Sequence, residues 1–224
     1  MLLTRYGLRE WGAATLVAAV LIAVIAWLGW WWGLIPISLL WIAVAGFFRD
    51  PLGRRPASDN PDAMVSPADG RITVVQRIPE HEATDGKPAL LIRIFLSVLN
   101  VHLNRAPCEG VVASITHRPG RYLDARSEES AKVNESNLLV MTRDNGDPIG
   151  IRQVSGAIAR RIVCPVRIGE RIGRAERYGM IKFGSTTELI VPDREGSEVC
   201  VSVGDKVRGG VDILVRLAPP NSET

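Results

Sequence analysis

The pattern of hydrophobic and polar positions divides the chain into two unlike parts. No charged residue occurs over the 38 positions from Trp11 to Phe48, whereas a single membrane-crossing helix needs roughly 20 residues. Near the middle of this stretch, Gly33 and Pro36 follow three tryptophans; glycine and proline interrupt helices, and tryptophan favours membrane interfaces. The pattern predicts a hydrophobic helical hairpin with a first span near 11–30, a turn near 31–36 and a second span near 37–48.

Basic residues flank this apolar stretch, with Arg5 and Arg9 before it and Arg49 and Arg54 after it. Because basic residues are retained on the cytoplasmic side of membranes, both ends are expected there. We therefore expect residues 1–50 to anchor the chain in the cell (inner) membrane, with the following domain on the cytoplasmic face. The second span is short, so a hairpin confined to one leaflet stays open, as does a buried helix pair in a soluble protein.

Beyond residue 50 the pattern changes to short apolar runs bounded by Gly, Pro, Asn and Asp, which is typical of β-strands. Asp144–Asp147 has the composition of a hairpin turn, and only Ser127–Lys132 has a helical pattern. The absence of a phosphate-binding glycine loop argues against a nucleotide-binding α/β fold. The expected fold class is mainly β (a β-rich α+β fold), with a barrel- or sandwich-like domain over residues 51–224. The candidate strands are Arg71–Gln76, Ala89–Leu96, Gly110–Thr116, Leu138–Arg143, Ile149–Val154, Ile158–Val163 and Val211–Leu217.

The segment Val201–Val211 resembles a hairpin of biotinyl- or lipoyl-type barrels, and Val65–Ile72 could supply the matching strand. In such carrier domains the modified lysine lies in an exposed turn, commonly beside Met or Asp. This sequence has no evident counterpart of that lysine. The shape is therefore expected without the carrier role.

The composition mainly excludes classes of metal-binding and redox sites. The cysteines, Cys108, Cys164 and Cys200, lie far apart, and the three histidines are equally scattered, so neither a CxxC motif nor an HExxH zinc pattern occurs. No metal is expected, and an odd number of dispersed cysteines fits a reducing compartment. The formal charge is only +3, and all but four of the 27 basic residues are arginines. Arginine suits contacts with phosphate or carboxylate, and no nucleic-acid partner is expected.

Three short segments carry residues that could do chemistry. Asp69 lies in a turn-like Ser-Pro-Ala-Asp-Gly segment, His102 follows the apolar run Leu90–Leu96, and Ser185 follows Gly184. An Asp, a His and a Ser form the set that activates a serine hydroxyl, since the His removes the proton and the Asp orients the His. Taken singly, each has an ordinary structural explanation. No glycine lies two positions after Ser185, so the nucleophile elbow of many hydrolases is missing.

Five longer segments together resemble the phosphatidylserine decarboxylase proenzyme family, in particular its short branch, whose central motif has a single histidine. The resemblance covers about residues 49–217. The segment that ends at Ser185 is the most specific, because it looks like the processing site of the family. The five segments are Val65–Gly70, Asn100–Pro107, Asn134–Asn137, Gln153–Val163 and Arg177–Ser185.

The resemblance implies a proenzyme that cleaves itself. Ser185 would attack the carbonyl group of Gly184, with His102 and Asp69 activating the serine. Elimination across the serine would then separate a large chain, 1–184, from a small chain, 185–224. The small chain would begin with a pyruvoyl group made from Ser185, and the two chains would form a heterodimer.

The resemblance also implies the reaction. The pyruvoyl group would form a Schiff base with the amine of membrane phosphatidylserine and accept electrons as carbon dioxide leaves, a task that pyridoxal phosphate performs elsewhere. Hydrolysis would give phosphatidylethanolamine. His102 is the expected proton donor, because histidine titrates near neutral pH.

One departure from the longer branch leaves the roles open. That branch has a second histidine at the position of Arg105. Either His102 serves both self-cleavage and protonation, or Arg105 binds the substrate phosphate or carboxylate and another group donates the proton. His117 is the other nearby histidine.

Two other classes of protein stay open at this point. A membrane-tethered serine hydrolase would use Ser185 without self-cleavage, and a carrier-like or structural barrel would have no reactive group. A set of arginines before Ser185 either docks onto anionic lipid headgroups or forms an ordinary exposed face. These arginines are Arg160, Arg161, Arg167, Arg171, Arg174 and Arg177.

Overall fold

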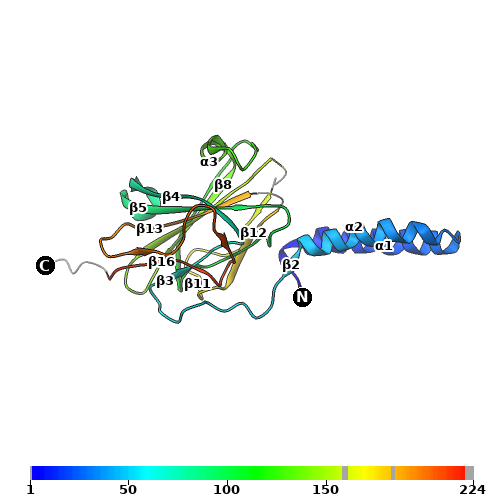
Figure 1. The fold of residues 1–224 in the computed structure, drawn as a ribbon, viewed down its shortest axis with the longest axis horizontal. Helices are drawn as coiled ribbons and strands as arrows, with labels where there is room; N and C mark the ends of the chain where they lie inside the picture. Colours follow the sequence, from blue (N-terminus) through cyan, green and yellow to red (C-terminus); the bar gives the residue numbers. More distant parts are fainter. Residues whose placement is uncertain (1, 158–160, 183–184, 220–224) are drawn as a thin grey trace. The chain divides into compact units, whose positions relative to one another are not determined.

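The computed structural model describes residues 2–157, 161–182 and 185–219. The fold is mainly β with an N-terminal helical pair, which confirms the predicted fold class (Figure 1). The chain divides into two compact units, Met1–Gly53 and Arg54–Thr224.

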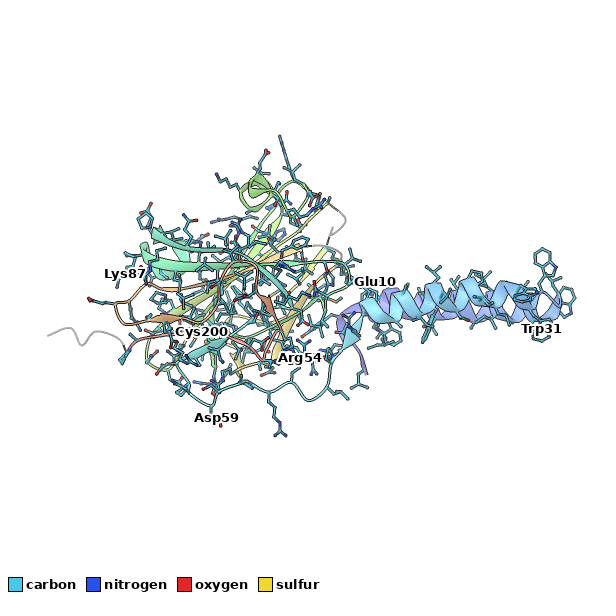
Figure 2. All side chains as sticks on the ribbon, viewed as in Figure 1. Glu10, Trp31, Arg54, Asp59, Lys87 and Cys200 are labelled. Carbon is cyan, nitrogen blue, oxygen red and sulfur yellow. The ribbon has the colours of Figure 1, made fainter. Side chains whose placement is uncertain are left out.

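A helical hairpin forms the first unit. Helix α1 spans Leu8–Trp27 and helix α2 spans Leu34–Phe47. The short 3-10 helix η2 (Trp31–Gly33) lies at the turn, where Figure 2 labels Trp31. The elements at the open end are the 3-10 helix η1 (Arg5–Gly7) and the antiparallel strands β1 (Leu2–Leu3) and β2 (Arg49–Asp50).

The turn of the hairpin comes earlier than the predicted range 31–36, because Pro36 falls inside the first turn of α2. The first N–H groups of a helix have no intrahelical partner, so a residue without an N–H costs little there. Gly29 follows the end of α1 instead, with a φ of 73° that glycine adopts without strain.

The two helices differ in their capacity to cross a membrane. By length and composition alone, the helix over Arg5–Trp27 is long and apolar enough to do so, whereas the apolar helix over Trp31–Phe47 is shorter. The indole Nε1 of Trp41 donates to Oγ1 of Thr15 at 2.9 Å and joins the two helices. The first unit therefore has the composition of a membrane anchor.

An eight-stranded antiparallel sheet, curled into a half-barrel, forms most of the second unit (Figure 1). Its order is β11-β7-β8-β9-β13-β5-β4-β15, so β13 is central. Within the described residues the edge strands β11 and β15 do not pair with each other, so the barrel stays open. The strands are β4 (Gly70–His81), β5 (Lys87–Leu96), β7 (Gly110–Arg118), β8 (Ser136–Thr142), β9 (Pro148–Val154), β11 (Arg171–Ile172), β13 (Ser185–Pro192) and β15 (Lys206–Val207).

Two three-stranded sheets, with the orders β10-β12-β6 and β14-β16-β3, complete the second unit. Two short helices, η3 (Glu82–Thr84) and α3 (Glu128–Val133), lie between strands. The strands of the small sheets are β3 (Ala63–Val65), β6 (Leu103–Arg105), β10 (Arg161–Val163), β12 (Arg177–Lys182), β14 (Glu198–Val199) and β16 (Ile213–Arg216).

Side-chain alternation buries both faces of the large sheet around β13. Ile92 and Leu189 belong to an inner cluster that includes Met64 of β3. Leu91 and Ile190, one position along each strand, pack in a second cluster on the opposite face. A strand buried on both faces lacks the polar and apolar alternation of a half-exposed strand.

The sequence pattern located most strands of the large sheet but missed its centre. The runs 71–76 and 89–96 lie within β4 and β5, and the predicted hairpin turn joins β8 to β9. In the run 158–163, residues 158–160 lie outside the described residues. The predicted helix is α3, and neither β12 nor β13 was predicted.

The two segments predicted to pair near the C-terminal end do so. Within these segments, Lys206 and Val207 of β15 pair with Arg71 and Gly70 of β4. The pairing of the two segments is therefore present, and the likeness to a carrier-type barrel stays a prediction.

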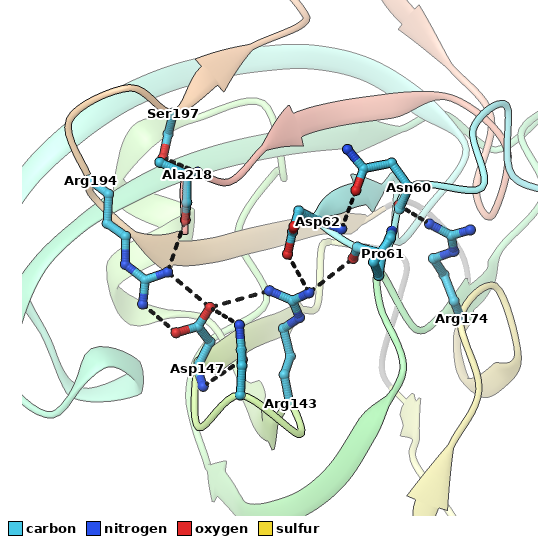
Figure 3. A network of polar contacts seen from close by, with 10 residues as sticks. Asn60, Pro61, Asp62, Arg143, Asp147, Arg174, Arg194, Ser197 and Ala218 are labelled. Atoms are coloured by element: carbon cyan, nitrogen blue, oxygen red, sulfur yellow. Dashed lines mark hydrogen bonds and ion pairs between the residues drawn. The ribbon is translucent and has the colours of Figure 1, made fainter. Parts of the chain in front are cut away.

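Ion pairs and hydrogen bonds connect the turn between β8 and β9 to distant parts of the chain (Figure 3). Asp147 accepts hydrogen bonds from Arg143 at 3.2 Å and from Nη1 of Arg194 at 2.9 Å. Arg143 also donates to Asp62 at 2.7 Å, and Arg194 donates to the carbonyl of Ala218 at 3.2 Å. Burial acts to raise the pKa of Asp147, but Arg194, Asn145 and Arg143 together outweigh it and hold that pKa below its ordinary value.

Candidate active site at one end of the large sheet

Described residues from the five segments that carry the family resemblance lie towards one end of the eight-stranded sheet. Antiparallel pairing brings the starts of β4, β8 and β13 together with the ends of β5 and β9. At this end Ser185 pairs with Leu96, Thr186 pairs with Val154, and Val154 pairs with Ser136. Candidate residues that are far apart in sequence therefore share one region.

Ser185 is the first residue of β13 and is fully buried. Its pairing with the core residue Leu96 directs both side chains to the inner face of the sheet. Within the described residues, Ser185 Oγ has no hydrogen-bond partner. A buried hydroxyl without a partner costs about 1–3 kcal/mol, so this position calls for a reason beyond packing. Gly184, the other predicted cleavage residue, lies outside the described residues.

His102 is fully buried immediately before β6. Its ring Nδ1 lies 3.0 Å from the carbonyl oxygen of Asn100. Because a carbonyl oxygen only accepts, Nδ1 carries the proton and a neutral ring has its lone pair on Nε2. The N–H of Ile181 donates to the carbonyl of His102 at 3.2 Å, which aligns His102 with the end of β12.

A hydrogen bond two residues further along joins the segment of His102 to the segment of Ser185. Asn104 Nδ2 donates to Oγ1 of Thr187 at 3.0 Å. His102 and Ser185 each precede one of these residues by two positions, and side chains two apart in extended chain point to the same face. His102 lies beside the end of β12, because its carbonyl accepts from the N–H of Ile181. Ser185 also follows the end of β12, three residues after Lys182 in the sequence. The pairing therefore predicts that the two side chains face the same region.

Asp69 lies at the same end of the sheet but has partners other than a histidine. Its carboxylate accepts from both Nη atoms of Arg54, with Nη2 to Oδ2 at 2.7 Å, and from the N–H of Gly209 at 2.9 Å. A Cβ added at Gly70 would lie 2.2 Å from the carbonyl oxygen of Phe95, so only glycine lets the chain after Asp69 approach β5. The orientation of His102 by Asp69 stays a prediction.

The two alternative residues are placed differently. Arg105 is buried, and its Nη1 donates to the carbonyl of Ala175 at 2.9 Å. His117 is exposed near the end of β7, with Nε2 lying 2.9 Å from a carboxylate oxygen of Glu135. Burial beside the other motif residues favours Arg105 over His117 as a member of the site.

A buried chain of amide hydrogen bonds was not predicted from the sequence. Gln153 Nε2 donates to Oδ1 of Asn104 at 2.9 Å, and Asn137 Nδ2 donates to Oε1 of Gln153 at 3.3 Å. All three residues belong to segments that carry the family resemblance, which was the available signal. Through Thr187, this chain of bonds reaches the start of β13.

The fully buried Tyr178 hydroxyl and the partly buried Cys164 thiol are not nucleophiles at neutral pH. Burial raises the pKa of the Tyr178 hydroxyl well above its ordinary value. Burial also raises the pKa of the Cys164 thiol to about 11, although the side chain of Asn137 hydrogen-bonds to it. Both groups therefore keep their protons.

The arginines before Ser185 do not form one free basic surface. Arg171 pairs with Asp144 at 2.7 Å, and Arg174 donates to the carbonyl of Ser58 at 2.9 Å. Arg160 lies outside the described residues. For Arg171 and Arg174, the structure favours the interpretation as an ordinary exposed face.

Two cavities adjoin the end of β5, and both include Phe95 and Ser97 in their lining. One has a volume of about 720 Å³ and is lined by polar and charged residues that include Asp69 and Lys206. The other has a volume of about 400 Å³. The apolar residues that line it are Phe95, Leu96, Val98, Ala125 and Ala157.

Across the three described ranges, no group of three or more His, Cys, Asp or Glu side chains could hold a metal ion. Asp69 pairs with Arg54, and His102 contacts the backbone carbonyl of Asn100.

Ser185 and His102 are both fully buried, and the sequence around Ser185 lacks the nucleophile elbow of many hydrolases. The family model described as phosphatidylserine decarboxylase matches residues 41–215. The phosphatidylserine decarboxylase proenzymes of Burkholderia vietnamiensis and Burkholderia multivorans are 39% and 38% identical to the chain over 205 residues, which is 92% of this chain and 92% of each relative. The chain therefore belongs to the phosphatidylserine decarboxylase family.

Proposed function

We propose that this protein is a self-processing, pyruvoyl-dependent carboxy-lyase that converts phosphatidylserine to phosphatidylethanolamine. The observation that carries the proposal is the position of Ser185, a buried hydroxyl without a described hydrogen bond at the start of the central strand. Family membership supplies the reaction class, and the relatives are named proenzymes, a word for precursors that require processing.

In the proposed processing step, Ser185 Oγ attacks the carbonyl carbon of Gly184. The C–N bond between the two residues breaks and an ester C–O bond forms, while Nε2 of His102 passes the hydroxyl proton to the released amine. Loss of the Cα proton of Ser185 then breaks the bond between Cβ and Oγ of the same residue. The oxygen stays on Gly184 as part of a carboxylate, and a double bond forms between Cα and Cβ of residue 185. Water finally replaces the nitrogen, which leaves as ammonia, and a ketone remains.

The surroundings of Ser185 fit a pyruvoyl group at this position. Ser185 Oγ makes no hydrogen bond within the described residues. Loss of this oxygen therefore breaks no hydrogen bond to a described residue. Thr186 pairs with Phe95 on one side and Val154 on the other, which holds the new end of the chain in place. The pyruvoyl group supplies an electron sink for decarboxylation.

The neighbouring residues take the remaining roles. His102, oriented by the Asn100 carbonyl, delivers a proton from Nε2 to the substrate carbon that has lost carbon dioxide. Arg105 is a candidate for binding the substrate phosphate or carboxylate, since guanidinium groups bind both. Asp69 holds Arg54 and the Gly209 backbone at the edge of the site, and its action on His102 remains part of the proposal.

After cleavage, the large chain 1–184 and the small chain 185–224 would remain one heterodimer. Strand β13 of the small chain lies between β9 and β5 of the large chain and pairs with both. Separating them would remove the centre of the sheet. The apolar helix over Arg5–Trp27 supports attachment to the inner membrane with the catalytic domain on its cytoplasmic face.

The serine hydrolase alternative makes a different prediction for Ser185. A hydrolase keeps its serine in an intact chain, whereas the proposed processing step consumes the Ser185 hydroxyl. A fluorophosphonate probe should therefore leave Ser185 unlabelled.

The proposal is tested with the purified full chain and mixed vesicles that contain phosphatidylserine. We expect release of carbon dioxide and formation of phosphatidylethanolamine, both inhibited by a carbonyl-trapping reagent such as phenylhydrazine and both lost in Ser185→Ala. Decarboxylation by Ser185→Ala at the wild-type rate would refute the proposed chemistry. Fluorophosphonate labelling of Ser185 in an intact chain would point to the hydrolase.

A further inference from the structure

The turn after β5 exposes two apolar side chains. Val98 and Leu99 are 45% and 84% exposed, whereas Val101 just after them is buried. Asn100 Oδ1 accepts from the N–H of Ser97 at 2.9 Å and from Ser97 Oγ at 2.7 Å. A turn fixed by these hydrogen bonds holds Leu99 outwards. We call residues 97–100 the apolar tip.

The apolar tip lies directly beside the proposed reaction site. The residue before it, Leu96, pairs with Ser185, and the carbonyl of Asn100 holds the ring of His102. Val98 also lines the cavity of about 400 Å³ next to Leu96. The apolar tip therefore borders both the candidate nucleophile and a largely apolar cavity.

The chemistry of these surroundings favours a lipid bilayer as the partner of the apolar tip. An exposed apolar surface on a soluble domain marks a contact with another molecule or a membrane. The chain carries an apolar helix over Arg5–Trp27 that is, by length and composition, able to cross a membrane, and such an anchor would keep the second unit near lipid. A lipid substrate must also leave the bilayer close to the site, and the apolar cavity suits its acyl-bearing part.

We propose that the apolar tip inserts Leu99 into the interfacial region of the bilayer, at the mouth of the cavity through which the lipid substrate enters. The entry role rests on the proposed function, whereas the membrane contact does not. Transfer of an exposed leucine side chain into an apolar environment is favourable, so a charged residue at this position should weaken the contact.

The matched control is Ile168, an apolar residue that is 67% exposed in another loop. The N–H of its neighbour Gly169 donates to the carbonyl of Val112 at 2.8 Å, near the start of β7 and thus at the opposite end of the sheet. Leu99→Asp and Ile168→Asp introduce the same charge at similarly exposed positions.

The first test compares kcat/KM on long-chain phosphatidylserine in phosphatidylcholine vesicles with kcat/KM on monomeric dihexanoyl phosphatidylserine. In Leu99→Asp, we expect the loss on vesicles to exceed the loss on the monomeric substrate by about tenfold, as for a transfer free energy near 1.4 kcal/mol. In Ile168→Asp, the ratio of kcat/KM on vesicles to kcat/KM on the monomeric substrate should stay at the wild-type value. Equal losses on both substrates in Leu99→Asp would overturn the entry role.

The second test does not depend on activity. Full-length Leu99→Cys and Ile168→Cys, each with Cys200→Ser, are labelled with a fluorophore and reconstituted into vesicles that contain nitroxide-labelled lipid. We expect quenching at position 99 and little at position 168. Absence of quenching at 99 in an enzyme that decarboxylates phosphatidylserine overturns the membrane contact while the proposed function stands. Quenching at 99 without decarboxylation supports the contact and refutes the function.

Discussion

For Asn104, the sequence motif indicated that the residue belongs to the site, but its hydrogen-bond partners depend on how the strands pair. It lies two residues after His102 in a segment that resembles the family, so its importance was visible in the sequence. Its partners were not: Thr187 and Gln153 come from strands far away along the chain. The motif predicted which residues belong to the site, whereas the hydrogen bonds depend on strand pairing that no local pattern encodes.

Asn104→Ala should destabilise the domain and slow self-cleavage. The change leaves the buried Gln153 amide and the Thr187 hydroxyl each without one partner, which predicts a fall of about 2–3 kcal/mol in the free energy of unfolding. The measurements are denaturant unfolding in detergent and a cleavage time course on gels. The matched control is the exposed Asn60→Ala, which should leave the cleavage rate unchanged. Cleavage of Asn104→Ala at the control rate would contradict the proposed role of these hydrogen bonds.

The strands that were predicted from the sequence and those that were missed differ in the residues that they bury. The predicted strands bury apolar runs, whereas the missed strand β13 also buries polar residues. Residues 71–76 and 89–96 are short apolar runs between turn residues, and both lie in observed strands. Strand β13 opens with Ser-Thr-Thr-Glu, and its Glu188 is fully buried because Arg93 and Arg152 pair with it across the neighbouring strands. Polar residues of this kind obscure a strand in the sequence, since their partners are tertiary.

Gly70→Ala should separate β4 from β5 at the site. The new Cβ would lie 2.2 Å from the carbonyl oxygen of Phe95, closer than real contacts allow, so the strands must part and move Asp69. We expect loss of most self-cleavage and a lower melting temperature. Gly173→Ala is the control, because its nearest neighbour is the flexible end of Glu176 at 3.4 Å. Full processing of Gly70→Ala would show that this close approach is dispensable.

The second unit as a whole is held together by contacts between distant parts of the chain. Asp147 connects the β8–β9 turn, through Arg143 and Arg194, to residues 62 and 218 (Figure 3). After the proposed cleavage, two of these partners would belong to the small chain. The network would then help to keep the two chains together.

The contribution of Asp147 should depend on pH in a defined direction. Its folded-state pKa is lowered, so its stabilisation is present above the unfolded value of about 3.9 and is lost as pH falls through the folded pKa. We expect Asp147→Asn to lower the free energy of unfolding by about 1–3 kcal/mol at pH 7. The difference from wild type should shrink below about pH 4.

The control for Asp147 is Asp144→Asn, which removes an exposed ion pair with Arg171. That variant should be indistinguishable from wild type at pH 7, because exposed ion pairs contribute little. Urea unfolding at a series of pH values makes the comparison. A difference between Asp147→Asn and wild type that stays constant down to pH 2 would contradict the ionised state assigned to Asp147.

The intact mass of the purified protein under denaturing conditions tests self-processing most directly. We predict two species of about 20 and about 4 kDa, the smaller about 17 Da lighter than a chain that begins with Ser185, as expected when its amine is replaced by a ketone. Ser185→Ala should give a single species near the 24.5 kDa of the whole chain. A single 24.5 kDa species from active wild-type protein, or two fragments from Ser185→Ala, would contradict self-cleavage at this serine.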